Sequence, residues 1–244
     1  MWPSFSLIAI IIGILFFATL LRAFTGFGDA LVAMPLLMLC LPGQIAIPLF
    51  ALISGTIGIV MVIRGRKEID LRSTWRLSLA SFAGVPIGIY YLHNFNDQLI
   101  KSMLGLALFI FTLLNFLRPG IFQLRSDKYS YFFGPLSGAL GAAYNINGPP
   151  IVVYATLRGW AQKDFHTTMQ GYFFLSGLSI LIGHGVSGLW TREVFVFFLL
   201  SLPSTIVALL LGTKIAKNVP MVLFHRITNI LVGCIGLFLV WENI

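Results

Sequence analysis

Charged residues are scarce in this chain: they make up 10% of its 244 residues, whereas soluble domains carry about 25%. So few charges cannot cover the surface of a water-soluble protein. Hydrophobic residues account for 58% of the chain, and the mean hydropathy is +0.93. The composition excludes an ordinary soluble domain and predicts that lipid surrounds much of the fold.

Cysteine is almost absent, since Cys40 and Cys234 are the two in the chain. Each lies within an apolar run, which argues against a disulfide framework or a metal cluster and predicts packing roles. The chain also lacks HExxH and GxSxG motifs, so an embedded zinc or serine hydrolase would have no residues to use. We expect no metal, no cofactor and no enzymatic activity.

Apolar sequence is what the chain has in abundance. Runs with little or no charge cover residues 1–21, 30–63, 77–96, 102–117, 129–157, 167–191, 194–213 and 227–241. They predict an all-α polytopic membrane protein with about eight to ten crossing or half-crossing helices. The first run has neither a basic start nor a small-residue cleavage pattern, so we expect a retained helix rather than a signal peptide.

The net charge of +8 is concentrated in the loops 64–76, 118–128 and 214–226. Basic clusters beside apolar runs are typical of cytoplasmic loops, and we expect no nucleic-acid partner. Counting crossings places the loop 158–164 on the cytoplasmic side as well, and Arg158 agrees with this. Both termini are then expected on the opposite side of the cell (inner) membrane.

Two segments are too short to cross the membrane twice. Residues 129–157 must begin and end on the same side, yet two full spans need about 40 residues. The sequence YNINGPP at 144–150 interrupts any continuous helix there, because proline lacks an amide hydrogen and clashes with the preceding turn. A comparable break at 22–29, followed by Pro35, makes residues 1–42 a second broken hairpin.

Each half of the chain is thus predicted to be a broken or re-entrant helical hairpin followed by three transmembrane helices. An odd number of spans turns the second half upside down, which is the inverted repeat of many secondary transporters. The predicted parts are a first repeat at 1–117, a cytoplasmic linker at 118–128 and a second repeat at 129–244. Several landmarks recur in order, namely the breaks themselves, Ser54-Gly55 and Ser176-Gly177, Pro86 and Pro203, and Gly105 and Gly233.

The second break carries a specific resemblance. The segment GALGAAYNINGPP at 138–150 resembles the hallmark of the TauE/SafE family of sulfite exporter-like permeases. The segment TGFGDALVAMP at 25–35 is similar to the glycine-rich N-terminal repeat of that family, although many members have glycines where this chain has Phe27 and Asp29. The resemblance implies transport of sulfite, organosulfonates or related small anions, generally outward.

Backbone groups freed by a helix break need partners in lipid, so unwound segments persist only beside protein or a water-filled cavity. We therefore expect the substrate at the two breaks, where helix N-termini, glycines and amide side chains suit an anion. A second role is open for the same residues, which is to cap the half-helices. The candidate substrate contacts are Arg22, Thr25, Gly26, Gly28, Tyr144, Asn145, Asn147, Gly148 and Pro149.

Asp29 is the sharpest candidate, because a carboxylate within apolar sequence is costly and by default functional. Protonation of Asp29 would couple the movement of an anion to that of a proton. The alternatives are an ion pair with Arg22 or simple solvation at the interface. Arg22 itself either draws in an anion or anchors its helix by snorkelling. We expect polar packing roles for His184, Gln170 and Tyr154.

Three other function classes can be weighed. The sequence GFGD at 26–29 fits the GxGD pattern of intramembrane aspartyl proteases, but that chemistry needs a second carboxylate, and the other aspartates lie in polar loops. A channel lined by the same breaks stays open. A receptor or structural role is opposed by the two costly breaks. The expected partners are the lipid bilayer, a small anion and protons, and the oligomeric state is not legible.

Overall fold

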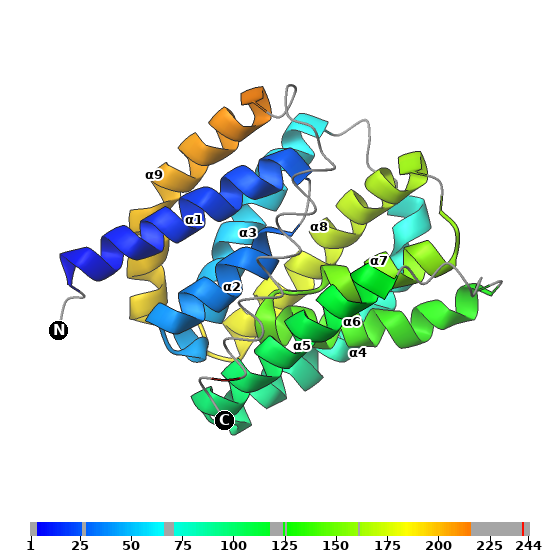
Figure 1. Cartoon of the computed structure of the whole chain (residues 1–244), viewed down its shortest axis with the longest axis horizontal. Helices are drawn as coiled ribbons and strands as arrows, with labels where there is room; N and C mark the ends of the chain where they lie inside the picture. Colours follow the sequence, from blue (N-terminus) through cyan, green and yellow to red (C-terminus); the bar gives the residue numbers. More distant parts are fainter. Residues whose placement is uncertain are drawn as a thin grey trace. The chain divides into compact units, whose positions relative to one another are not determined.

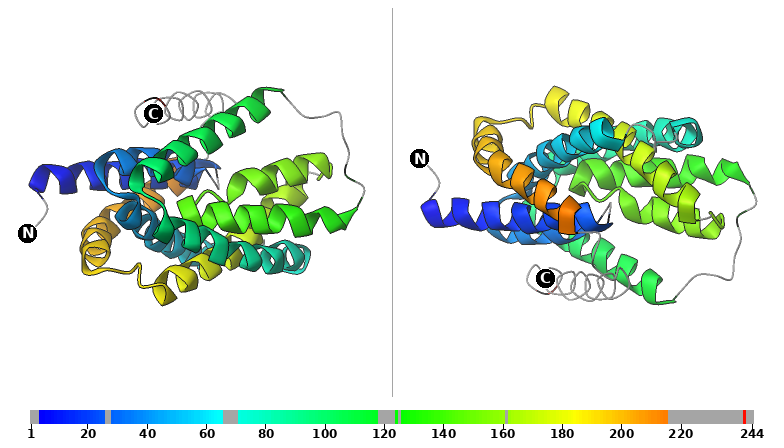
Figure 2. Two further views of the ribbon diagram at one scale, coloured as in Figure 1. Left: turned by 90° about the horizontal axis from the view of Figure 1, so that it is seen from below. Right: turned by 90° about the horizontal axis from the view of Figure 1, so that it is seen from above.

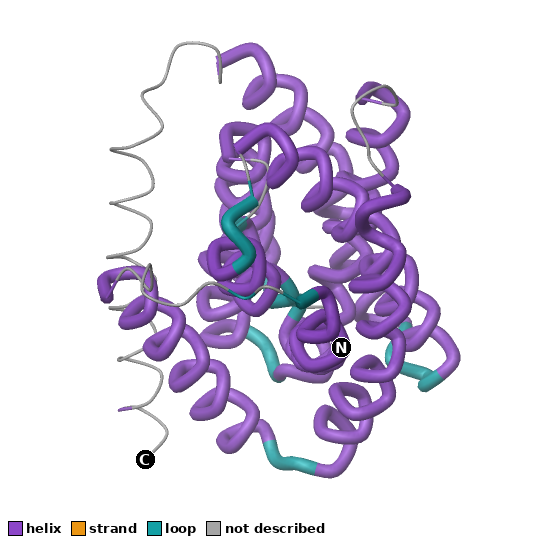
Figure 3. The backbone as a smooth tube through the Cα atoms, turned by 90° about the vertical axis from the view of Figure 1, so that its right-hand side faces the viewer, coloured by secondary structure: helices purple, strands orange, loops and turns teal. Residues whose placement is uncertain are grey.

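The computed structural model describes residues 4–25, 28–65, 71–117, 124, 126–160, 162–215 and 241. Within these residues every regular element is a helix, joined by short loops, and none is a strand (Figure 3). The elements are α1 (Phe5–Thr25), α2 (Asp29–Cys40), α3 (Gly43–Gly65), α4 (Leu71–Asn94), α5 (Asp97–Leu117), a 3-10 turn η1 (Asp127–Tyr129), α6 (Ser130–Tyr144), α7 (Gly148–Leu157), α8 (Gln162–Val186) and α9 (Arg192–Ile215).

Several helices begin where a polar side chain can satisfy a free backbone N–H. Ser4 Oγ accepts from the Leu7 amide ahead of α1, and Asn96 Oδ1 accepts from the Leu99 amide at the start of α5. Asp97 Oδ1 accepts from the amide of Gly43, the first residue of α3, at 2.7 Å. These contacts supply partners for donors that an α-helix leaves open.

Three helices of the described chain are long and apolar enough to cross a bilayer: α1 over Phe5–Ala23, α3 over Gly43–Met61 and α9 over Arg192–Lys214. Shorter apolar stretches cover α2, α7 and the Gly171–Val186 part of α8. The prediction of an all-helical membrane protein is confirmed at this level. The predicted last span, 227–241, lies almost wholly outside the described residues.

The helices group into two compact units that are discontinuous in sequence. Unit 1 comprises residues 1–53, 95–116 and 189–244, which bring α1, α2, the first part of α3, α5 and α9 together. Unit 2 comprises residues 54–94 and 117–188, with α4, α6, α7 and α8. Each predicted repeat therefore contributes helices to both units.

Unit 2 is built on the close pairing of α4 with α6, visible in Figure 1. Small residues line both helices at four-residue spacing: Ala80, Gly84 and Gly88 on α4, and Gly134 and Gly138 on α6. A methyl group at Gly84 would lie 1.9 Å from the Pro135 carbonyl oxygen, and one at Gly138 would lie 2.0 Å from the Ser81 carbonyl oxygen. The backbones approach as closely as small residues allow, which is the usual device for helix association in lipid.

In unit 1 the most extensive pairing is that of α1 with α9 (Figures 1 and 2). Gly212 on α9 faces Ala23 on α1, since a methyl group at Gly212 would come within 2.5 Å of the Ala23 Cβ. Buried Ser201, Thr205 and Ala208 precede Gly212 on α9. Small side chains thus support this pairing as well.

Candidate functional site

The first break spans three residues between the end of α1 at Thr25 and the start of α2 at Asp29. Gly28 precedes α2 with φ of 94° and ψ of −2°, a left-handed conformation that favours glycine. The predicted contact Gly26 lies outside the described residues, as does the side chain of Thr25. The predicted position of the break is confirmed, and Gly28 has a conformational reason to be glycine.

Arg22 and Asp29 form an ion pair across this break. Arg22 Nη1 lies 3.0 Å from Asp29 Oδ2, and the two side chains are only 7% and 8% exposed. Of the alternatives weighed for Asp29, the structure has the ion pair with Arg22. The pair neutralises two charges that would each be costly in a membrane protein.

The helix ends favour the same arrangement of charge. Arg22 lies in the last turn of α1, where the partial charge of the helix is negative, and Asp29 lies in the first turn of α2, where it is positive. Each side chain is therefore stabilised by its own helix as well as by its partner. The ion pair connects the two arms of the first hairpin.

The second break also spans three residues, between the end of α6 at Tyr144 and the start of α7 at Gly148. Asn145 adopts a left-handed conformation with φ of 57°, and its amide donates to the Gly141 carbonyl at 2.7 Å. The Ile146 amide donates to the Leu140 carbonyl at 3.3 Å. The first of these is the 5→1 bond of the αL helix-ending motif, and asparagine is the residue after glycine that best tolerates this conformation.

Asn147 joins the second break to its surroundings rather than capping α7. Its side chain makes no capping hydrogen bond, and its Nδ2 donates to Ser176 Oγ on α8 at 2.8 Å. Its carbonyl oxygen accepts a short hydrogen bond from Ser137 Oγ, and Ser137 in turn accepts from the Tyr172 hydroxyl at 2.6 Å. Of the two roles open for this residue, capping through the side chain is not what the structure has.

Sequence reasoning missed three residues of this network: Ser137, Tyr172 and Ser176. All three are fully buried. Tyr172 and Ser176 are four residues apart on α8 and therefore share a face, which was the available signal. Buried hydroxyls need partners, and here they find them in one another and in the break.

The other predicted contacts at the second break differ in burial. Tyr144 is buried, with its ring edge-to-face against Tyr91 at 6.0 Å between centroids. Gly148 is buried, and Pro149 is half-buried. Because Pro149 and Pro150 have no amide hydrogen, Gly148 and Ile151 supply the only N–H groups among the first four residues of α7. The N-terminus of α7 therefore offers an anion fewer donors than a typical helix.

Two of the three residues expected to pack are described with side chains. His184 is fully buried, and its Nε2 lies 2.8 Å from the carbonyl oxygen of Ala142 in the last turn of α6. Tyr154 is buried in the core of unit 2 and contacts the Trp160 ring. The side chain of Gln170 lies outside the described residues. Packing roles are confirmed for His184 and Tyr154.

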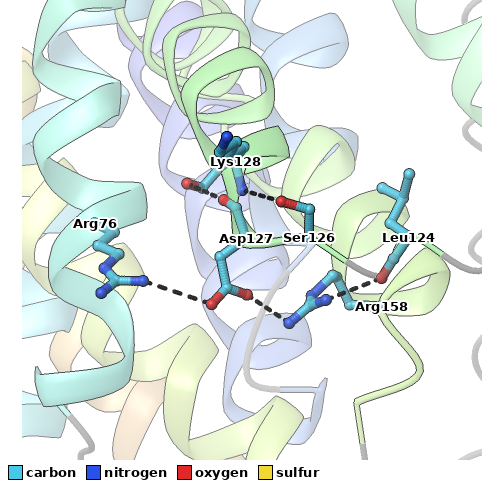
Figure 4. Close-up of polar contacts among 7 residues, drawn as sticks. Arg76, Leu124, Ser126, Asp127, Lys128 and Arg158 are labelled. Atoms are coloured by element: carbon cyan, nitrogen blue, oxygen red, sulfur yellow. Dashed lines mark hydrogen bonds and ion pairs between the residues drawn. The ribbon is translucent and has the colours of Figure 1, made fainter.

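A separate cluster of polar contacts in unit 2 is centred on Asp127 (Figure 4). Asp127 binds Arg76 at the start of α4 through Oδ2 at 3.5 Å, and it binds Arg158 at the end of α7 through Oδ1. Arg158 Nη1 also donates to the Leu124 carbonyl at 2.9 Å. Arg76 and Arg158, both predicted to be cytoplasmic, thus share one carboxylate and lie at one end of the unit.

No group of three or more metal-binding side chains occurs among the residues that the structure describes. Cys40 is a free cysteine, and Cys234 lies outside that part of the chain. The first break belongs to unit 1 and the second to unit 2.

Comparison with known proteins agrees with the resemblance found in the sequence. Residues 11–239 match the family described as sulfite exporter TauE/SafE. No curated protein and no solved structure matches the chain. Members of the family are membrane transporters rather than enzymes, which removes the protease alternative. With a match over nearly its whole length and with apolar helices long enough to cross a membrane, this chain belongs to the TauE/SafE family of membrane transporters.

Proposed function

We propose that the protein is a proton-coupled secondary transporter that exports a small sulfur-containing anion such as sulfite or an organosulfonate. Family membership supports the class of substrate. The observation that carries the coupling is the buried ion pair of Arg22 and Asp29 across the first break. Because Asp29 can take up a proton, the buried Arg22 can bind a substrate anion in place of the Asp29 carboxylate.

The proposed cycle follows from charge balance. In the resting state Asp29 is ionised and neutralises Arg22. When Asp29 takes up a proton, Arg22 loses its counterion and binds an oxyanion in its place, with a guanidinium fork that suits sulfonate oxygens. Release of the anion and the proton restores the pair. One proton accompanies each anion, so the empty site and the loaded site both have no net charge.

The remaining candidate contacts are proposed for binding and not for coupling. Thr25, Gly26 and Gly28 lie next to the ion pair in sequence, and small residues there let an anion approach the backbone. At the second break, Tyr144, Asn145, Asn147, Gly148 and Pro149 offer neutral contacts. Asn147 Nδ2 donates one of its two hydrogens to Ser176, so we assign the second hydrogen to the substrate.

We also propose the inverted-repeat architecture, with repeats at 1–117 and 129–244 joined by a linker at 118–128. The order of elements pairs α1 with α6, α2 with α7, α3 with α8 and α4 with α9. Under this pairing the contact of α4 with α6 corresponds to that of α9 with α1, and these are the two most extensive helix pairings. The fourth helix of each repeat packs on the first helix of the other.

The equal length of the breaks supports the same pairing. Both breaks are three residues long, and Arg22 and Asp29 correspond in position to Gly141 and Gly148. The charged pair of the first break thus has no charged counterpart in the second. This difference supports the assignment of coupling to the first hairpin alone.

We also propose on which side of the membrane the loops and the termini lie. We place the loops that carry Arg76 and Arg158 in the cytoplasm, and both termini on the opposite side of the membrane. The shared contact of these two arginines with Asp127 supports a common side for their loops.

Counterflow in proteoliposomes tests the proposed function. Vesicles loaded with sulfite, an organosulfonate or a carboxylate are assayed for uptake of labelled anion, with and without a pH gradient. Organosulfonates are the informative substrates, because they stay ionised across the pH range and do not cross lipid as neutral acids. We expect saturable exchange of a sulfur-containing anion. The exchange should be faster when the side of the membrane that holds the loaded anion is acidic. The absence of exchange for every anion, or unitary conductance in planar bilayers, contradicts a carrier.

A further inference from the structure

Three hydrogen bonds form a ring with α8 and hold the second break to α6 and α8. The Tyr172 hydroxyl donates to Ser137 Oγ, Ser137 donates to the Asn147 carbonyl, and Asn147 Nδ2 donates to Ser176 Oγ. Tyr172 and Ser176 lie four residues apart on α8, so the helix itself completes the ring. Tyr172, Ser137 and Ser176 have no exposed surface, so water does not compete for the bond between Tyr172 and Ser137.

The ring depends on the Tyr172 hydroxyl. The hydroxyl donates to the buried Ser137 Oγ, so removing it leaves this acceptor without its donor. An unsatisfied buried group costs more than the bond itself contributes, and hydrogen bonds in a chain strengthen one another. Asn147 is bound through both its side chain and its carbonyl, hence the position of the residue just before α7 depends on the ring.

We propose that Tyr172 is a positioning residue for transport, which acts through Ser137 and Asn147 to hold the second break in its binding conformation. The ring contains no carboxylate, amine or imidazole, in contrast to the ion pair of Arg22 and Asp29 at the first break. Protonation therefore changes the first break and leaves the second in place. The second hairpin supplies a fixed set of neutral contacts while the first exchanges its counterion.

Hydrogen exchange of the intact protein in nanodiscs tests the ring without reference to substrate. Local opening sets the exchange rate of backbone amides. In Tyr172→Phe and in Ser137→Ala, we expect the amides of residues 145–151 to exchange about five-fold faster, the factor that corresponds to one buried hydrogen bond. The matched control is Ser78→Ala, since Ser78 is buried on α4 and its hydroxyl has no hydrogen-bond partner among the residues that the structure describes. Wild-type exchange in both ring variants, or equal acceleration in the control, overturns the proposal.

Transport kinetics test the link to substrate, and this arm rests on the proposed function. We expect Tyr172→Phe to raise the KM for counterflow about five-fold and to leave the maximal rate unchanged, because the binding conformation becomes less populated. The exposed Tyr131→Phe serves as the control. Faster exchange with an unchanged KM overturns the positioning role. If the wild-type protein carries no anion, the proposed function fails, and the hydrogen-exchange result still decides whether the ring holds the break.

Discussion

Arg22 Nη1 and Asp29 Oδ2 lie 3.0 Å apart, although a helix break separates the two residues in the chain. The contact joins the end of α1 to the start of α2 and neutralises two buried charges. The first break therefore contains a pair of opposite charges, while hydrogen bonds between neutral groups hold the second break.

A double-mutant cycle measures the coupling of the ion pair. Arg22→Gln and Asp29→Asn each leave one buried charge without its counterion, which costs about 3–5 kcal/mol of stability. The double variant removes both charges, so we expect it to be more stable than either single variant. Thermal denaturation in detergent measures the stability of each variant. Additive losses contradict a coupled pair.

Asp29→Asn separates proton coupling from substrate binding. The amide cannot take up a proton, so we expect the pH gradient to lose its effect on sulfonate flux, while counterflow at equal pH continues. The matched control is Asp97→Asn in the same unit. Asp97 Oδ1 accepts a hydrogen bond from the Gly43 amide, and the side-chain oxygen of asparagine can accept the same bond. A normal response to pH in Asp29→Asn rejects the coupling role of this residue.

Gly148→Ala tests how closely a ligand approaches the second break. A methyl group there would meet only the Phe173 ring, at an ordinary 3.5 Å, so the fold should tolerate it. We expect normal thermal stability and a rise in KM of about ten-fold or more, since about 1.4 kcal/mol of lost contact changes affinity ten-fold. Unchanged counterflow kinetics would show that no ligand approaches the backbone at this residue.

Gly84→Ala tests the pairing of α4 with α6. The new methyl group would lie 1.9 Å from the Pro135 carbonyl oxygen, and the helices would have to separate. Overpacking of this kind costs about 1–3 kcal/mol or more, and we expect a lower thermal midpoint and less folded protein after extraction. Gly177→Ala is the control on α8, where no atom of the described residues lies within 4 Å of the added group. Equal stability of the two variants contradicts the close pairing.

Cysteine labelling tests the topology. In a background without Cys40 and Cys234, single cysteines at Lys128 and Gly159 should react with an impermeant reagent from one side of the membrane. A cysteine at Ser4 should react from the other side. Labelling of Lys128 and Gly159 from opposite sides excludes the inverted repeat as proposed.

Local sequence chemistry accounts for the parts of this protein that could be predicted. Scarce charge and long apolar runs determine a helical membrane protein, because backbone groups in lipid must bond within their own segment. Glycine, asparagine and paired prolines determine the second break at 145–147, since these residues stop a helix wherever it lies. The segments 25–35 and 138–150 were specific enough to indicate the family that residues 11–239 match.

Tertiary structure alone decided which partners those residues take. Asp29 had two other roles open in the sequence, and the choice of Arg22 depends on how α1 and α2 fold back on each other. Asn147 is bound by Ser176, which lies 29 residues further along the chain, and local pattern carries no information about such a contact. The grouping of α4 with α6 and of α1 with α9 is likewise a matter of packing, because small residues mark a face for close approach without naming the helix that meets it.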